Sequence, residues 1–309
     1  MPRSQSVLVP RVGQFKDTYH RIKRDKRFKD VTPIIFCEGD SWFSTPLSMN
    51  MLDWLVYAPP ELEALGVPVF GAGGLFFRAE ESGYHASANP KNPKASMFVP
   101  KNIHKLSGWY KHHEFDIVLL SAGGNDFVAD FLDKTFKGLQ PMSVSKAFRE
   151  IEKSGKFKTV YEAYQAFVGA FLDIRPNVPI LAHTYDYPRL LGKRAEFTVA
   201  NLGAAAIFAK GTGPWIGDRI AHVLPDTKDQ REFARMMMDG FTENVLMPVK
   251  KKFKTKGRFE FVDLRGILTK DTDWFDEMHP TGEGFRILAE VMRVRIGELL
   301  PEGKRMGVL

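Results

Sequence analysis

The chain of 309 residues is 44% hydrophobic and 26% charged, an ordinary globular balance that excludes a disordered or fibrous protein. No apolar run approaches the roughly 18 residues that a membrane helix needs. Residues 1–30 lack the apolar core of a secretory signal. The default location is therefore the cytoplasm, unless the protein is exported by a route that needs no signal. The net charge is +7, and the single cysteine, Cys37, can form no intramolecular disulfide.

Apolar runs of strand length recur along the chain, and they are continuous rather than alternating, as in strands that are covered on both faces. Segments with apolar residues at helical spacing lie between and after them. This alternation predicts parallel βαβ units and a three-layer sandwich. The expected strands are 33–37, 67–70, 115–121, 178–183 and 259–262, and the clearest helices are 49–55, 160–174, 232–249 and 284–300.

Three stretches fit this scheme poorly and are expected to overhang the C-terminal edge of the sheet. Residues 82–100 are predicted to form a long irregular loop between the second and third strands, and 190–220 a connection rich in glycine and alanine. Residues 132–158 are a polar connection interrupted by glycine and proline, whose secondary structure the sequence leaves undetermined. We expect one domain over 31–300, preceded by a basic extension (1–30) and followed by a short tail (301–309).

Ser41 follows the first predicted strand, where an open α/β sheet presents reactive groups. A serine hydroxyl needs an adjacent base to attack an acyl carbon. The turn Glu38-Gly39-Asp40-Ser41 places Ser41 near the start of a helix, where its own N–H can point at developing negative charge. The structural alternative is a serine that caps the helix.

Asn125 follows the third predicted strand, within Gly123-Gly124-Asn125-Asp126. The glycines allow a close approach of the backbone, and the side-chain amide can donate a hydrogen bond to an oxyanion. The alternative is an ordinary Gly/Asn turn. Gly73-Gly74 offers a weaker signal, a possible backbone N–H donor after the second strand.

His279 lies three residues after Asp276, a separation that one turn of backbone can bring into contact. Such a carboxylate fixes the imidazole tautomer and stabilises the imidazolium. A lone histidine here is also typical of a surface or capping position. The ordered set of serine, asparagine and Asp-x-x-His at strand ends is what favours a hydrolase.

These residues resemble the motif blocks of the SGNH (GDSL-type) hydrolase superfamily. The matching blocks are Gly39-Asp40-Ser41, Gly73-Gly74, Gly124-Asn125-Asp126 and Asp276-x-x-His279. The resemblance implies a flavodoxin-like α/β/α sandwich with a five-stranded parallel sheet. It also implies Ser41 as nucleophile, His279 as general base and acid, Asp276 as its orienting group, and an oxyanion hole made by the N–H groups of Ser41 and Gly74 with the Asn125 side chain.

A bacterial esterase/lipase-like subgroup is also similar in the stretch after the fourth strand, His183–Pro188, and in Gly213-Pro214-Trp215. On this basis residues near the nucleophile are interpreted as lining the substrate pocket, although Trp42 fits a core role equally well. The proposed pocket residues are Trp42, Gly73, Asp126, Tyr185 and Trp215.

The sequence therefore predicts a serine hydrolase that cleaves carboxylic esters of small-molecule, lipid or carbohydrate substrates, with no cofactor and no metal. An acyltransferase or O-acetyl transferase uses the same serine chemistry and stays open. A non-catalytic binder of anionic polymer is the alternative of another class, because basic residues crowd into 16–29 and 250–258. No nucleic-acid motif accompanies these runs, and the oligomeric state stays open.

Overall fold

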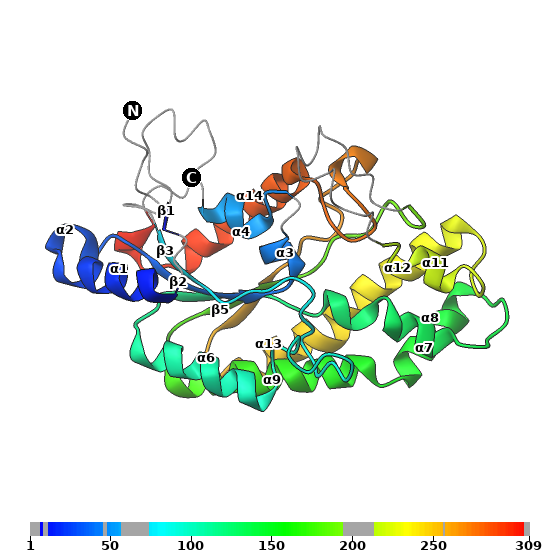
Figure 1. Ribbon diagram of the computed structural model, residues 1–309, viewed down its shortest axis with the longest axis horizontal. Helices are drawn as coiled ribbons and strands as arrows, with labels where there is room; N and C mark the ends of the chain where they lie inside the picture. Colours follow the sequence, from blue (N-terminus) through cyan, green and yellow to red (C-terminus); the bar gives the residue numbers. More distant parts are fainter. Residues whose placement is uncertain are drawn as a thin grey trace.

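The computed structural model describes residues 7–8, 12–45, 48–56, 74–193, 213–255 and 257–305. Its centre is a parallel sheet with the strand order β1-β3-β2-β4-β5-β6 (Figure 1). The strands are β1 (Val7–Leu8), β2 (Ile34–Gly39), β3 (Gly74–Arg78), β4 (Ile117–Ser121), β5 (Ile180–His183) and β6 (Phe259–Val262).

The order of β3, β2, β4, β5 and β6 is the flavodoxin-like one, so the predicted α/β fold is confirmed. The two-residue strand β1 extends the predicted five strands to six, by pairing with β3 at the edge. Four of the predicted strands are found where expected. The second predicted strand, 67–70, lies outside the described residues, and the strand paired with β2 on that side is Gly74–Arg78.

Helices cover both faces of the sheet. In Figure 1, α4 and α14 lie on one side, and α6, α9 and α13 lie on the other. The helices are α1 (Val12–Arg24), α2 (Lys26–Lys29), α3 (Ser41–Ser44), α4 (Met51–Val56), α6 (Pro100–His112), α7 (Asp130–Phe136), α8 (Val144–Lys153), α9 (Lys156–Ile174), α11 (Gly217–Ile220), α12 (Thr227–Phe241), α13 (Met247–Phe253) and α14 (Gly282–Leu299). Short 3₁₀ turns are η1 (Gly124–Phe127), η4 (Asp271–Asp273) and η5 (Glu302–Lys304), and η3 (Thr242–Leu246) is a π-helical segment that joins α12 to α13.

The four predicted helices are confirmed as α4, α9, α12 with its continuation through η3, and α14. The 132–158 connection contains α8 and most of α7. Residues 82–99 form the expected irregular loop, with one isolated bridge between His85 and Ser96. Of the 190–220 connection, residues 194–212 lie outside the described residues.

Aromatic side chains fill the layer between the sheet and α6 and α9. Phe36 of β2 contacts Phe77 of β3, with ring centroids 5.0 Å apart, and Phe171 of α9 at 5.2 Å. Phe15 and Tyr19 of α1 are buried in the same cluster. The expected boundary at residue 30 is therefore corrected, because α1 packs into the domain core. No helix in the described part of the chain is long and apolar enough to cross a membrane.

Candidate active site

The predicted nucleophile and amide donor follow two strands that are neighbours in the sheet. Gly39 at the end of β2 is paired with Ser121 at the end of β4. A Cβ atom at Gly39 would lie 2.9 Å from the Ser121 Cβ, closer than folded proteins tolerate, so this pairing requires glycine. The parallel register therefore brings the segments of Ser41 and Asn125 to the same edge of the sheet.

Ser41 is the first residue of α3, and Asp40 caps that helix. The Asp40 carboxylate accepts a hydrogen bond from the Trp42 N–H at 3.1 Å. The alternative in which Ser41 itself is the cap is therefore wrong, and its hydroxyl is free for another partner.

That partner is His279. The distance from Ser41 Oγ to His279 Nε2 is 2.9 Å, and His279 Nδ1 lies 2.9 Å from Oδ2 of Asp276. Ser41 and His279 are 238 positions apart in the chain. The three predicted catalytic side chains are thus brought into one chain of hydrogen bonds, in the order that a serine nucleophile requires.

Asp276 is buried, and its carboxylate also accepts hydrogen bonds from the backbone N–H groups of Met278 and His279, each at 2.7 Å. Burial alone would raise its pKa. The hydrogen bond and the charge of His279, together with these two N–H groups, outweigh burial and hold the pKa of Asp276 below its usual value. Asp276 is therefore ionised at neutral pH and suited to stabilise an imidazolium.

The cap residue Asp40 is held from two further strand ends. The Ser121 hydroxyl donates to it at 2.8 Å, and the Tyr185 hydroxyl donates to its other oxygen. Burial raises the pKa of Asp40 to about 6, against the opposing effect of the Tyr185 and Ser121 hydrogen bonds. A buried carboxylate that accepts three hydrogen bonds thus fixes the turn that carries Ser41.

Asn125 lies in η1 and is partly exposed. Its Nδ2 donates one hydrogen bond to the Tyr84 carbonyl oxygen at 2.9 Å, which orients the amide and leaves the second N–H available. The neighbouring Asp126 is fully buried and accepts hydrogen bonds from the Ala86 and Ser87 N–H groups at 2.7 and 3.2 Å. Its predicted place in the pocket is therefore wrong: Asp126 holds the 82–99 loop beneath the site.

The prediction for Gly74 is also wrong. Gly74 begins β3, and the next N–H, from Leu75, donates to the Pro33 carbonyl beside the start of β2. Ser41 follows the other end of β2, whose six residues at about 3.3 Å each separate the two by roughly 20 Å. The segment after β3 that does reach the site is 79–84, because the Glu81 N–H donates to the Gly39 carbonyl. Gly73 lies outside the described residues.

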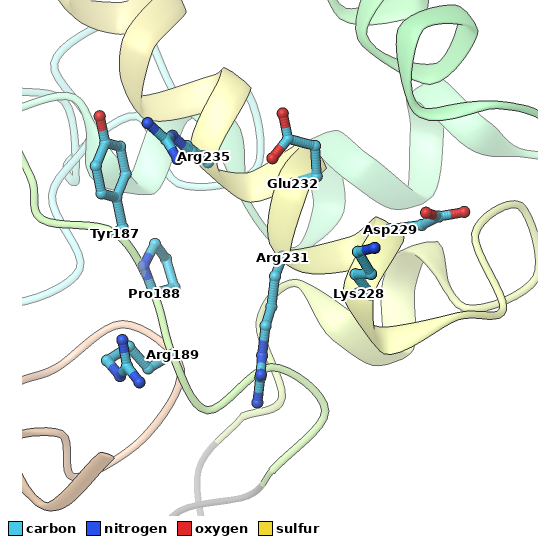
Figure 2. A pocket seen from close by; sticks show the side chains of 8 residues that line it. All are labelled: Tyr187, Pro188, Arg189, Lys228, Asp229, Arg231, Glu232 and Arg235. Carbon is cyan, nitrogen blue, oxygen red and sulfur yellow. The ribbon is translucent and has the colours of Figure 1, made fainter. Parts of the chain in front are cut away.

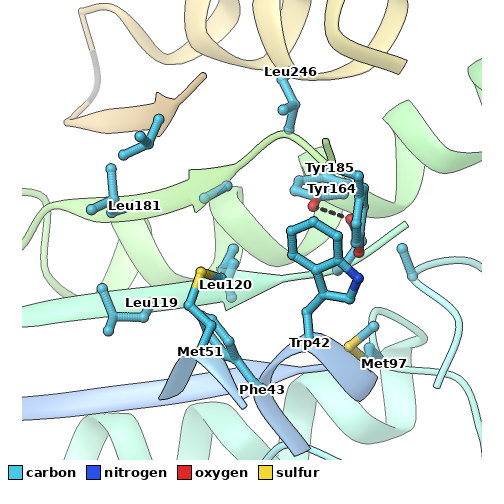
Figure 3. Packing of buried hydrophobic residues seen from close by; sticks show 14 of the residues in the cluster. Trp42, Phe43, Met51, Met97, Leu119, Leu120, Tyr164, Leu181, Tyr185 and Leu246 are labelled. Carbon is cyan, nitrogen blue, oxygen red and sulfur yellow. Dashed lines mark hydrogen bonds between the residues drawn. The ribbon is translucent and has the colours of Figure 1, made fainter. Parts of the chain in front are cut away.

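Trp42 and Tyr185 are buried rather than lining an open pocket, so this part of the prediction is corrected. Their rings meet edge to face, with centroids 4.9 Å apart. Figure 3 shows the two side chains among the buried residues around them. The Trp42 indole N–H donates to the Met278 carbonyl at 2.9 Å, which ties the helix of the nucleophile to the turn of the base. The core role that the sequence also allowed for Trp42 is confirmed.

Glu277, which the sequence reading missed, organises the loops beside this turn. Its buried carboxylate accepts hydrogen bonds from the N–H groups of Gly192, Trp215, Ile216 and Gly217. Trp215 is partly exposed and therefore stands next to the Asp276–His279 turn. All four donors are backbone groups, so no side-chain pattern in the sequence marks them.

Within the described residues, no group of three or more histidine, cysteine or acidic side chains is placed to hold a metal ion.

No family model and no curated protein sequence matches the chain. Among solved structures it is similar to a family 3 carbohydrate esterase of Clostridium thermocellum, at 14% identity and a TM-score of 0.47, over 87% of this chain and 97% of that one. It is also similar to an extracellular lipase of Streptomyces rimosus, at 17% identity and a TM-score of 0.46, over 84% of this chain and 98% of the lipase. A family 3 carbohydrate esterase from Talaromyces cellulolyticus is similar at 13% identity and a TM-score of 0.43, over 86% and 97% of the two chains. At such low identity, a reaction has to be assigned to this protein from its own side chains.

Proposed function

We propose that this protein is a serine hydrolase of the SGNH type that cleaves carboxylic esters. The observation that carries the proposal is the hydrogen-bonded series from Ser41 through His279 to Asp276, with both links at 2.9 Å. A histidine that serves only as a surface or capping residue does not require a serine hydroxyl at one ring nitrogen and a buried carboxylate at the other, whereas a catalytic histidine does.

In the proposed reaction, His279 Nε2 takes the Ser41 proton while Ser41 Oγ forms a bond to the ester carbonyl carbon. The carbonyl oxygen becomes an oxyanion, which accepts hydrogen bonds from the Ser41 N–H and the second N–H of Asn125. The imidazolium, stabilised by Asp276, then protonates the alcohol oxygen as the carbon–oxygen bond breaks.

Water completes the cycle. His279 takes a proton from water as the water oxygen attacks the acyl carbon, and the Ser41 oxygen leaves with that proton, so the acid is released and the enzyme is restored. If an alcohol or a sugar hydroxyl replaces water, the same steps make an acyltransferase. Trp215 is a partly exposed aromatic residue beside the catalytic turn, and we assign it to the wall of the acyl or alcohol site.

The test is hydrolysis of p-nitrophenyl acetate and butyrate by the wild type and by Ser41→Ala, with fluorophosphonate labelling mapped by mass spectrometry. Ser44→Ala, in the same short helix, is the matched control. We expect turnover and a label on Ser41 in the wild type and in the control, and neither in Ser41→Ala. A label without turnover would favour the acyltransferase, and activity retained by folded Ser41→Ala would remove the proposal.

A further inference from the structure

A cavity of about 460 Å³ lies between α12 and the segment that follows β5. Figure 2 shows the side chains around it. The lining residues are Tyr187, Pro188, Arg189, Lys228, Asp229, Arg231, Glu232 and Arg235. We call it the arginine pocket. Four of its eight lining side chains are cationic and two are acidic.

The cations of α12 share one face of that helix. Lys228, Arg231 and Arg235 are spaced by three and four residues, the separation of neighbours on a helix surface. In Figure 2, Arg231 extends along the side on which Arg189 lies, whereas the carboxyl groups of Asp229 and Glu232 project away from Arg189. Within the described part of the chain, neither Lys228 nor Arg231 forms an ion pair.

Two of the four lining cations already have ion-pair partners: Arg189 pairs with Asp271, and Arg235 lies 3.9 Å from Asp239. The carboxylate of Asp271 pairs with Arg189, whose Nε lies 2.8 Å from Oδ1. The pKa of Asp271 is lowered first by this hydrogen bond and further by the charges of Arg189, Arg231 and Lys193. Lys228 and Arg231 are thus the lining cations without an ion pair in the described part of the chain, and an anion from outside could pair with them.

The wall of the pocket is attached to the catalytic machinery at three points. Two residues before Tyr187, Tyr185 donates to Asp40. Arg189 binds Asp271, in the turn that leads to Asp276. Gly192, three residues after Arg189, donates to Glu277 at 2.6 Å. The pocket therefore lies at the same edge of the sheet as Ser41, on the side of β5 and β6.

We propose that the arginine pocket binds a negatively charged group of the ester substrate, so that the enzyme acts on anionic rather than neutral esters. The inference rests on the proposed esterase function. Guanidinium groups are planar double donors that fit carboxylate, sulfate and phosphate oxygens, which makes these anions the chemical class to test. Tyr187, with Arg235 stacked 5.1 Å from its ring centre, supplies a flat surface beside the cations.

The kinetic experiment compares two polymers with the same ester. O-acetylated polygalacturonate carries a carboxylate on every residue, so no exact spacing between ester and anion is needed, and O-acetylated galactan is its neutral counterpart. We expect kcat/KM on the acidic polymer to exceed that on the neutral one by about tenfold, a typical effect of one charge-assisted contact. Arg231→Glu should abolish this preference by raising KM for the acidic polymer.

The matched control is Arg149→Glu, an exposed arginine of α8 that makes the same change in net charge outside the pocket. It should keep the ratio. Equal activity on both polymers, or a ratio that Arg231→Glu leaves intact, would overturn the anionic-substrate inference while leaving the esterase proposal in place. The esterase proposal would fail in a different way: Ser41→Ala would release acetate from the neutral polymer as fast as the wild type does.

A binding measurement separates the pocket from catalysis. Titration of Ser41→Ala with trigalacturonate, inorganic sulfate and inorganic phosphate by calorimetry should show binding that Arg231→Glu weakens about tenfold and Arg149→Glu does not. Tighter binding of sulfate or phosphate than of trigalacturonate would assign the anion within the proposed class. Absence of binding by all three, or binding that Arg231→Glu leaves unchanged, would contradict the proposal.

Discussion

The hydroxyl of Tyr185 donates a hydrogen bond to the carboxylate of Asp40, although the two residues are 145 positions apart in the chain. Asp40 caps the helix of the nucleophile, and Tyr185 follows β5, so this bond joins two strand ends beneath the site. Gly124 is needed for the same contact, since a Cβ there would lie 3.0 Å from the Tyr185 ring.

Tyr185→Phe is expected to destabilise the protein more at pH 8 than at pH 5. The folded-state pKa of Asp40 is about 6, above the ordinary value of 3.8, so its ionisation already costs stability as pH rises through 6. Losing the Tyr185 donor raises that pKa further. We expect a loss of about 1.5–3 kcal/mol in the free energy of unfolding at pH 8, and less at pH 5.

Urea unfolding at both pH values measures this difference. Tyr164→Phe is the control, because Tyr164 is equally buried but donates to the carbonyl oxygen of Ala122, which does not titrate in this range. An equal loss at pH 5 and pH 8 in Tyr185→Phe would show that Asp40 is not the group concerned.

Asn125→Ala should lower kcat about 10²–10³-fold, or roughly 3–4 kcal/mol of transition-state stabilisation, with little effect on KM. The side-chain amide is already held by the Tyr84 carbonyl, so it is oriented before substrate binds. Steady-state kinetics on p-nitrophenyl acetate check the prediction. Asn244→Ala, whose amide bonds the Gly240 carbonyl within the π-helical segment, should be near normal, and a near-normal kcat in Asn125→Ala would remove Asn125 from the oxyanion hole.

Glu277→Ala should reduce kcat at least about tenfold although Glu277 touches none of the reacting atoms. The change leaves four buried N–H groups without their acceptor and releases the loops from the Asp276–His279 turn. Fluorophosphonate labelling of Ser41 should slow in parallel. Glu283→Gln, at an exposed position in the first turn of α14, is the control. Unchanged kcat together with lowered stability would limit Glu277 to a structural role.

Glu80→Gln should reduce the change in the free energy of unfolding between pH 4.5 and pH 7. Burial raises the pKa of Glu80 to about 7, despite its ion pair with Arg78, so its contribution to stability is present below pH 4.5 and is lost as pH rises to 7. A shift from 4.5 to about 7 corresponds to at most about 3 kcal/mol. Unfolding free energies from pH 4.5 to 8 test this, with exposed Glu243→Gln as control. A variant that keeps the wild-type slope would show that another group titrates.

The sequence was sufficient for most of the sheet and for bringing Ser41, His279 and Asp276 into one candidate site. Strands β2, β4, β5 and β6 are continuous apolar runs, and each catalytic residue carries a local pattern, a turn after a strand or an Asp-x-x-His. The strand β3 was missed because the run at 67–70 is as apolar as Gly74–Arg78. Because 67–70 was taken as the strand, Gly74 was predicted to follow the strand and donate its N–H at the site, whereas it begins the strand at the opposite end of the sheet.

Side-chain direction explains the other errors. A tryptophan after the nucleophile and an acid after Asn125 are typical of a pocket wall, but Trp42 turns into the core and Asp126 binds backbone N–H groups of a distant loop. Position along the chain does not determine which way a side chain points at a strand end. The Arg189, Arg231 and Asp271 cluster was missed because its members come from three separate segments.

The separation of Ser41 and His279 has a consequence for synthesis and refolding. The six strands that the structure describes all precede Asp276 in the chain, so a nascent or truncated polypeptide that ends after β6 contains all six but lacks His279, the proposed base. If the proposed mechanism is right, hydrolysis can begin only after the final segment has docked beside α3 and α4. The rate at which esterase activity recovers during refolding would therefore report this last docking step. Circular dichroism would follow the earlier assembly of the strands.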